Sequence, residues 1–151
     1  MFTVADMMTP HPYTLIASNT LADAKRMMEK HHIRHIPITN KDNTLIGIIS
    51  QRDILSAQAP SMDQRFQTQF IASLDTPIEQ SMHRNLRSVT PNAGLKEAAM
   101  YMQRHHIGCL PIIDQDKLVG IITDSDFVSI AINLLELQEE IEPIESEYEL
   151  Y

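Results

Sequence analysis

The sequence predicts a mixed α/β (α+β) protein in which one small unit occurs twice and the two copies pack about a pseudo-two-fold axis. The first observation is an internal repeat, because Leu95, Ile107 and Pro111 each lie 74 positions after a residue of the same type. The second is a set of short runs rich in Ile and Val, which are typical of buried strands. The third is apolar residues at helical spacing between those runs. Two copies are fewer than the three or so that a stacked solenoid needs, so we expect a closed pair.

In the first copy we expect a lead-in helix, a strand, a helix, two strands joined by a turn, and a short helix. Their ranges are 4–8, 13–16, 21–32, 33–39, 45–49 and 51–57. Thr20 can cap the helix that begins at Leu21. Pro37 inside the second strand indicates an edge or a bulge, because proline cannot donate to a sheet ladder. Each copy should therefore hold a small three-stranded sheet with flanking helices.

The second copy repeats this order and ends in a longer helix that runs from Asp124 to about Glu140. Its earlier elements are expected at 78–82, 86–89, 95–105, 109–113 and 118–122. Thr76-Pro77 places a capping residue before a proline at the first helical position, which favours a helix start. We divide the chain into a first repeat (1–58), a connector (59–75, of which 64–72 can be helical), a second repeat (76–135) and an acidic helix end and tail (136–151).

Composition limits the class of partner and compartment. The 151 residues carry a net charge of −8, which argues against nucleic acid as a bulk partner, since phosphate backbones attract basic surfaces. The one cysteine, Cys109, excludes an internal disulfide and fits a reducing compartment. The start of the chain lacks the features of a signal peptide, and no apolar run approaches the roughly 20 residues of a membrane span. We therefore expect a soluble cytoplasmic protein.

One string recurs at the junction of the last strand and last helix of each copy. It reads Gly47-x-x-Ser50-x-x-Asp53 and Gly120-x-x-Thr123-x-x-Asp126. A hydroxyl and a carboxylate at a helix start can hold a sugar and a phosphate, because free N–H groups there favour an anion. The same string is a capping box that stabilises the helix itself. The two interpretations can both hold at one site, and the residues alone leave them open.

The doubled string, with His32-Ile33-Arg34-His35-Ile36-Pro37-Ile38 and its counterpart in the second copy, resembles a tandem pair of CBS domains, the family named for cystathionine β-synthase. The resemblance covers about residues 1–135. It implies two clefts between the repeats that bind adenosine ligands such as AMP, ADP, ATP or S-adenosylmethionine, with AMP or ATP as the expected regulatory ligand. It also implies a role in energy sensing or in regulating an enzyme or transporter, and assembly of stand-alone pairs into homodimers.

The resemblance assigns candidate roles to individual residues. It implies that Asp53 and Asp126 accept hydrogen bonds from ribose hydroxyls, and that Ser50 and Thr123 offer hydroxyls to ribose or phosphate. Arg34 matches a position that is basic and contacts phosphate in the nucleotide-sensing subunit of the AMP-activated kinase. Arg52 is a second candidate for a phosphate contact. The resemblance places the adenine at backbone groups of 14–16 and 88–90, with apolar Ile36 and Leu110. Thr14, Pro37 and Pro111 complete the candidate ligand-binding residues.

The second copy departs from this pattern, since it carries Gly108 in place of Arg34 and Ser125 in place of Arg52. We therefore expect unequal clefts. For both arginines, the alternative is a solvated surface charge.

Other chemistry-bearing residues have ordinary structural interpretations. The pairs His31-His32 and His105-His106 invite a zinc or nickel site. Neighbouring residues on a helix diverge, however, and a cationic group at a helix C-terminus is favoured by the dipole. Cys109 in an apolar strand is expected to be a buried, inert thiol. We expect no metal site.

The last helix has more apolar surface than one repeat needs, which indicates a dimer seam; packing over its own sheet is the alternative. No nucleophile–base pair or metal triad is visible, so we expect a protein without catalytic activity. The leading hypothesis is a nucleotide-binding regulatory module. The alternatives are a ligand-free interaction scaffold of the same fold and a small enzyme or metal-binding protein.

Overall fold

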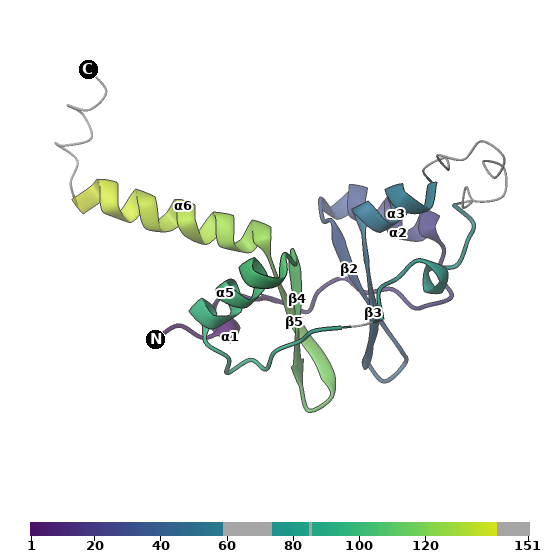
Figure 1. The fold of residues 1–151 in the computed structure, drawn as a ribbon, viewed down its shortest axis with the longest axis horizontal. Coiled ribbons are helices and arrows are strands. Elements are labelled where there is room, and N and C mark those ends of the chain that lie inside the picture. The colour runs from purple at the N-terminus through teal and green to yellow at the C-terminus, as the bar shows by residue number, and fades with distance from the viewer. Residues whose placement is uncertain (59–73, 85, 142–151) are drawn as a thin grey trace, which may run out of the picture.

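The computed structural model describes residues 1–58, 74–84 and 86–141 (Figure 1). The first repeat contributes α1 (Val4–Met7), β1 (Thr9–Pro10), α2 (Leu21–His31), β2 (His35–Thr39), β3 (Leu45–Ser50) and α3 (Gln51–Gln58). The second contributes the 3-10 helix η2 (Ile78–Gln80), α5 (Leu95–His105), β4 (Cys109–Asp114), β5 (Lys117–Thr123) and α6 (Asp124–Ile141). The expected helix at 64–72 and the tail beyond 141 lie outside the described residues.

The mixed α/β class is confirmed, and the two halves lie side by side. Each half is built on an antiparallel hairpin, β2–β3 in one and β4–β5 in the other. Figure 1 shows α2 and α3 beside the first hairpin, α5 beside the second, and α6 running away from the body. The two cores are fully buried and aliphatic, with Leu21, Ile36, Ile38 and Ile49 in one and Val4, Leu110, Ile112 and Ile122 in the other.

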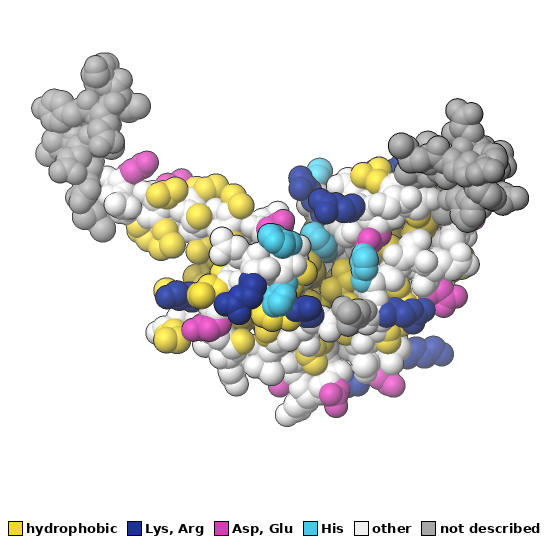
Figure 2. Space-filling model, viewed as in Figure 1, with side chains coloured by type: hydrophobic (Ala, Val, Ile, Leu, Met, Phe, Trp, Pro, Cys, Tyr) yellow, Lys and Arg dark blue, Asp and Glu magenta, His cyan; other side chains and the backbone are white. Residues whose placement is uncertain are grey.

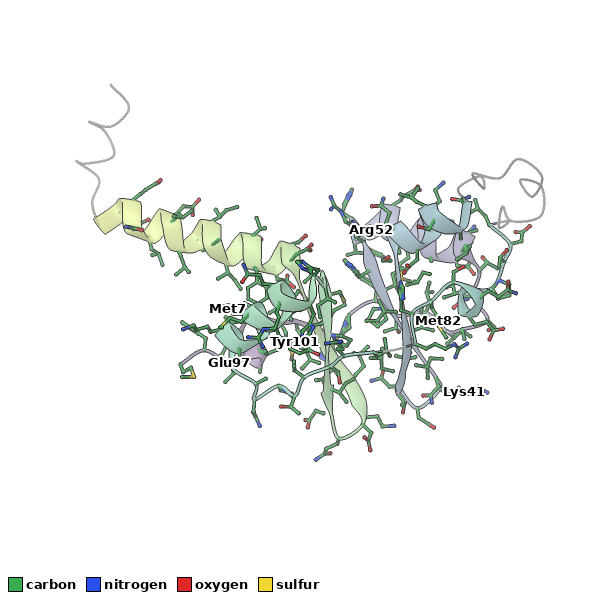
Figure 3. All side chains as sticks on the ribbon, in the orientation of Figure 1. Met7, Lys41, Arg52, Met82, Glu97 and Tyr101 are labelled. Atoms are coloured by element: carbon green, nitrogen blue, oxygen red, sulfur yellow. The ribbon has the colours of Figure 1, made fainter. Side chains whose placement is uncertain are left out.

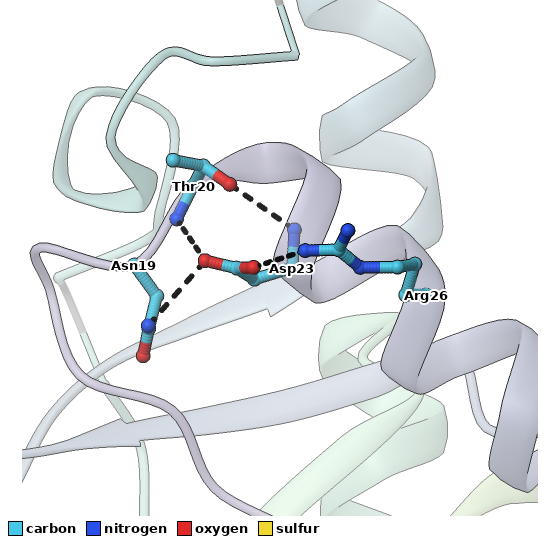
Figure 4. Close-up of polar contacts among 4 residues, drawn as sticks. All are labelled: Asn19, Thr20, Asp23 and Arg26. Atoms are coloured by element: carbon cyan, nitrogen blue, oxygen red, sulfur yellow. Dashed lines mark hydrogen bonds and ion pairs between the residues drawn. The ribbon is translucent and has the colours of Figure 1, made fainter.

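Helix α2 begins at the capping residue that the sequence predicts. The backbone N–H of Asp23 donates to the Thr20 hydroxyl at 3.2 Å, and the N–H of Thr20 donates to the Asp23 carboxylate at 2.9 Å (Figure 4). The bond from the Thr20 backbone and the nearby Arg26 guanidinium hold the pKa of Asp23 below its usual value. The reciprocal bonds satisfy N–H groups that the first helical turn leaves without partners.

The third strand of each half is shorter than expected. In place of strands over 13–16 and 86–89, the structure has single parallel bridges at Leu15 and Val89. Leu15 donates to Pro37 O and accepts from Thr39 N. The preceding rung would require the N–H that Pro37 lacks, so the ladder stops there. Val89 bonds in the same way to Pro111.

The two halves exchange their lead-in segments. Strand β1 pairs with β5 of the second half, and Val4 lies in the second core. Ile78 and Met82 lie in the first core. Figure 3 shows the consequence at its labelled residues, with Met7 beside α5 and Met82 beside β3. Neither core is complete without a segment from the other repeat.

The motif glycines lie directly against the exchanged lead-ins. A Cβ at Gly47 would lie 2.5 Å from Met82 Sδ, and one at Gly120 would lie 2.4 Å from Met8 Sδ. The tips of the hairpins also bond to each other, since Asn43 Nδ2 donates to Leu118 O at 2.9 Å and Leu118 N donates to Asn43 O at 3.1 Å. Among the described residues, no helix is long and apolar enough to cross a bilayer.

Candidate functional site

A cleft of about 560 Å³ opens between the two halves. Figure 2 shows histidine side chains gathered around this hollow. The first half and the crossing segment line it with Arg34, His35, Ile48, Ser50, Gln51, Arg52, Asp53 and His83, and the second half with His106, Ile107, Gly108, Cys109 and Asp124. Four of the predicted site residues, Arg34, Ser50, Arg52 and Asp53, are therefore brought together.

Equivalent strand and helix ends form the two walls. Where α3 begins, Gln51 N donates to Arg34 O at 2.8 Å. Where α6 begins, Asp124 N donates to Gly108 O at 3.0 Å. These bonds hold the start of α3 against the residue before β2, and the start of α6 against the residue before β4. Both helix N-termini are therefore fixed at the edge of the cleft.

Asp53 combines a capping bond with a position on the cleft wall. Its Oδ2 accepts from Ser50 N at 2.8 Å, and its own N–H donates to Ser50 Oγ at 3.1 Å. The Oδ1 atom lies 2.7 Å from His83 Nε2. The carboxylate is 13% exposed, and a carboxylate has lone pairs for about four hydrogen bonds. It can therefore cap the helix and still accept from a ligand hydroxyl.

Asp126 makes the same cap in the second half but lies outside this cleft. Its Oδ2 accepts from Thr123 N at 2.9 Å, and Thr123 Oγ1 accepts from Asp126 N at 3.4 Å. Its Oδ1 accepts from the Thr9 hydroxyl at 3.4 Å. Thr9 and His83 occupy corresponding places on the exchanged lead-ins. Asp53, on the cleft wall, therefore has the His83 imidazole as its third partner. Asp126 has the Thr9 hydroxyl, which is bonded only weakly.

The fixed positive charges of the cleft come from one half. Arg34 and Arg52 line it and are exposed, and Figure 3 labels Arg52 near the start of α3. Their counterparts are Gly108, which also lines the cleft, and Ser125. Asp53 and Asp124 balance the arginines in formal charge. An anion would therefore be favoured on the arginine side and disfavoured beside Asp124.

His35 and Cys109 line the cleft from equivalent strand positions of the two halves. Burial lowers the pKa of His35, although Asp124 and Asp53 act in the opposite direction. A Cβ on Gly108 would lie 3.4 Å from the His35 ring and 3.2 Å from the Asp124 carboxylate, so the three lie in close contact. Burial, with smaller contributions from the charges of Asp124 and Asp126, raises the pKa of Cys109 to about 12, which agrees with the inert thiol expected from the sequence.

The remaining predicted site residues do not line the cleft. Thr123 and Asp126 lie at the other motif. The side chains of Ile36, Pro37, Leu110 and Pro111 are buried in the cores, so a ligand would meet their backbone before their side chains. Thr14 is half-buried beside the Leu15 bridge.

Sequence reasoning missed His83, His35 and Asp124 as cleft residues. The repeat offset aligns His83 with Thr9, but nothing in the sequence shows that the lead-ins cross. The histidine pairs end their helices as expected, with His32 and His106 at the left-handed capping positions. His31 stacks on Tyr13 with ring centroids 3.7 Å apart. Within 1–58, 74–84 and 86–141, no three His, Cys, Asp or Glu side chains are placed to hold a metal ion.

Comparison with known proteins identifies the repeats. The family profile described as CBS domain matches residues 4–60 and 75–133. CBS domain-containing protein YhcV from Bacillus subtilis is 33% identical over 127 residues, which are 83% of this chain and 83% of that protein. Other curated relatives are longer, and the chain spans 20% of one and 42% of another.

Solved structures give the same fold. A Vibrio cholerae protein named as an acetoin utilization protein (AcuB) is 56% identical, with a TM-score of 0.77 over 93% of this chain and 97% of that one. The CBS domain pair of protein MJ0100, solved with 5′-methylthioadenosine and S-adenosyl-L-methionine, is 25% identical, with a TM-score of 0.72 over 88% of this chain and 98% of that one.

Proposed function

The chain belongs to the CBS-domain family, and we propose that it is a non-catalytic regulatory module that binds an adenosine-containing ligand in the cleft beside Asp53. AMP or ATP is the expected ligand. The observation that carries this proposal is the meeting of Asp53, Ser50, Arg34 and Arg52 on one wall of a cleft between the repeats. A carboxylate suits ribose hydroxyls, and guanidinium groups suit phosphate.

Ligand binding would act on the packing of the two halves. Both halves line the cleft, and each core contains a segment of the other repeat. A ligand that contacts both walls would favour one relative position of the halves, and only such a difference in affinity can carry a signal. An enzyme or transporter would sense that change. We also propose that the protein works in the cytoplasm as a homodimer.

A ligand-free scaffold is the second candidate, and one observation favours it. Both motif aspartates already bond to the backbone at their own helix starts, as pure capping residues would. In that case the motif would stabilise helices, and the cleft would be a by-product of the fold.

Calorimetry with AMP, ADP, ATP, S-adenosylmethionine and NAD separates the candidates. We expect one adenosine ligand to bind, and Arg34→Ala to weaken a phosphorylated ligand about tenfold or more, because a hydrogen bond to a charged group is worth roughly 1.5–3 kcal/mol. Arg104→Ala, an exposed arginine on α5 outside the cleft, is the matched control. No binding by any of the five ligands would overturn the nucleotide proposal in favour of the scaffold.

A further inference from the structure

The two walls of the cleft differ in charge at three equivalent positions of the repeats. The residues at these positions are Arg34, Gln51 and Arg52 in the first half, and Gly108, Asp124 and Ser125 in the second. The first set carries two positive charges, from its arginines, and the second set carries one negative charge, from its aspartate. An anionic group in the cleft is therefore attracted to the first wall and repelled by the second.

Asp124 is the first residue of α6, and its charge acts on the interior of the cleft. A Cβ on Gly108, which also lines the cleft, would lie 3.2 Å from Asp124 Oδ2. Burial lowers the pKa of His35 and raises that of Cys109, and in both groups the largest effect of a charge comes from Asp124. Asp124 is itself exposed, so its carboxylate is accessible to a ligand that enters from solvent.

The carboxylate of Asp124 also takes up an anion position at the start of its own helix. Its Oδ1 accepts from Ser125 N at 2.8 Å. Backbone N–H groups at a helix N-terminus attract anions, and α3 and α6 both begin at the edge of the cleft. At α6 one of these groups is already bonded to a carboxylate, whereas the corresponding residue of α3 is the uncharged Gln51. The start of α6 is therefore a poor place for a phosphate.

The fixed cations that the described residues bring to the cleft are the guanidinium groups of Arg34 and Arg52. Together they can neutralise one phosphate monoester, which carries about two negative charges. A groove between α2 and α3 adjoins the cleft at Arg34, and it adds Lys25 and Glu29, whose charges cancel. Each further phosphate of a ligand would therefore add negative charge without a new fixed cation, in a cleft that also holds Asp124.

We propose that Asp124 is a specificity-determining residue of the cleft, which favours an adenosine ligand with a single phosphate over ADP and ATP. The inference rests on the nucleotide-binding function proposed above and narrows its ligand to a nucleoside monophosphate. Arg34 and Arg52 hold the one phosphate on the first wall, and Asp124 repels a longer phosphate chain from the second. The difference between the repeats thus sets the length of the phosphate chain that the cleft accepts.

The ratio of the AMP and ATP dissociation constants tests this role. Calorimetry of the full chain without magnesium, at pH 8 where an ordinary imidazole is largely uncharged, measures both. The unaltered chain should bind AMP about tenfold more tightly than ATP, and Asp124→Asn should reduce this preference about three- to tenfold by tightening ATP. Asparagine removes the charge but keeps an oxygen for Ser125 N. Asp114→Asn, the same change at an exposed residue outside the cleft, should leave the ratio unchanged.

The possible outcomes separate this inference from the function on which it rests. A ratio that stays the same in Asp124→Asn, including an equal loss of both nucleotides, would overturn the role of Asp124 and leave the nucleotide function in place. Binding of ATP as tight as that of AMP by the unaltered chain would overturn the preference for one phosphate. Failure of the unaltered chain to bind any adenosine ligand would overturn the proposed function together with the inference.

Discussion

The two repeats use one string of residues for the same structural task but place it in different surroundings. Asp53 and Asp126 each cap a helix by accepting from the N–H three residues earlier. Only Asp53 faces the cleft between the halves, with His83 as its third partner. Asp126 has a weak bond to Thr9 instead. The comparison teaches that the motif secures the helix in both halves, whereas the residues around it decide which copy can hold a ligand.

The largest expected effect is on ligand affinity, when each of the two carboxylates is replaced in turn. Asp53→Asn should weaken the nucleotide proposed for the cleft about thirtyfold or more, because a charged acceptor is worth roughly 1.5–3 kcal/mol. Asp126→Asn should change the affinity less than about twofold. Asparagine keeps a side-chain oxygen for the cap, so both variants should melt near the unaltered protein. Calorimetry measures the affinities, and equal losses at the two positions would show that the halves are equivalent for the ligand.

The next effect tests the exchange of lead-ins. Gly47→Ala and Gly120→Ala would each push a methyl group into a methionine from the other repeat, and such overpacking costs about 1–3 kcal/mol. Gly47→Ala should cost more, because its Cβ would also lie 3.2 Å from the rigid backbone carbonyl of His83. Urea unfolding measures both.

A double variant that shortens the clashing methionine is the control for Gly47→Ala. Met82→Ala combined with Gly47→Ala should cost less than the two changes added together, because residues in contact couple. Strict additivity would contradict the packing of Met82 on Gly47.

A smaller effect comes from the third partner of each carboxylate. His83→Ala should tighten the cleft ligand about two- to fivefold, by releasing Asp53 Oδ1 from its contact with the largely exposed His83 imidazole. Thr9→Ala, at the corresponding place, should leave this affinity unchanged. A loss of affinity in His83→Ala would instead mean that the imidazole contacts the ligand.

Much of the fold follows from local chemistry that the sequence displays. Thr20 caps α2, α5 occupies the range expected for it, and both motif strings form the predicted caps. Periodicity and capping act within a few residues, so a single sequence reveals them. The strands expected over 13–16 and 86–89 are only single bridges in the structure. The sequence does not show that the first of these segments pairs with the strand that contains Pro37, so it does not show that the missing N–H of Pro37 stops the ladder.

The site was harder to predict because it depends on contacts between distant segments. Arg34, Ser50, Arg52 and Asp53 could be named from their motifs. The crossing of the lead-ins brings His83 to Asp53 from 30 positions away, and no local pattern encodes that crossing. The burial of Ile36 and Leu110 also depends on packing between distant segments, so their local sequence does not show that their side chains point away from the cleft.

The last two effects appear only away from neutral pH, and they compare equivalent positions on the two cleft walls. His35 pairs with Ser50 across its hairpin, as Cys109 does with Thr123. Burial lowers the pKa of His35 from 6.5, so the unfolded state binds more protons once pH falls below about 6.5. Stability should therefore decline with acidification through this window, and His35→Gln should flatten the decline.

Cys109 should limit stability at the opposite end of the pH range. Its pKa rises from 9.0 to about 12 in the folded protein, so the unfolded thiol ionises first. Stability should fall as pH rises from about 9 towards 12, and Cys109→Ala should remove that part of the fall. Urea unfolding across pH measures both limbs. If His35→Gln altered only the alkaline limb, or Cys109→Ala only the acid limb, the buried groups of the two halves would not be the source of the pH dependence.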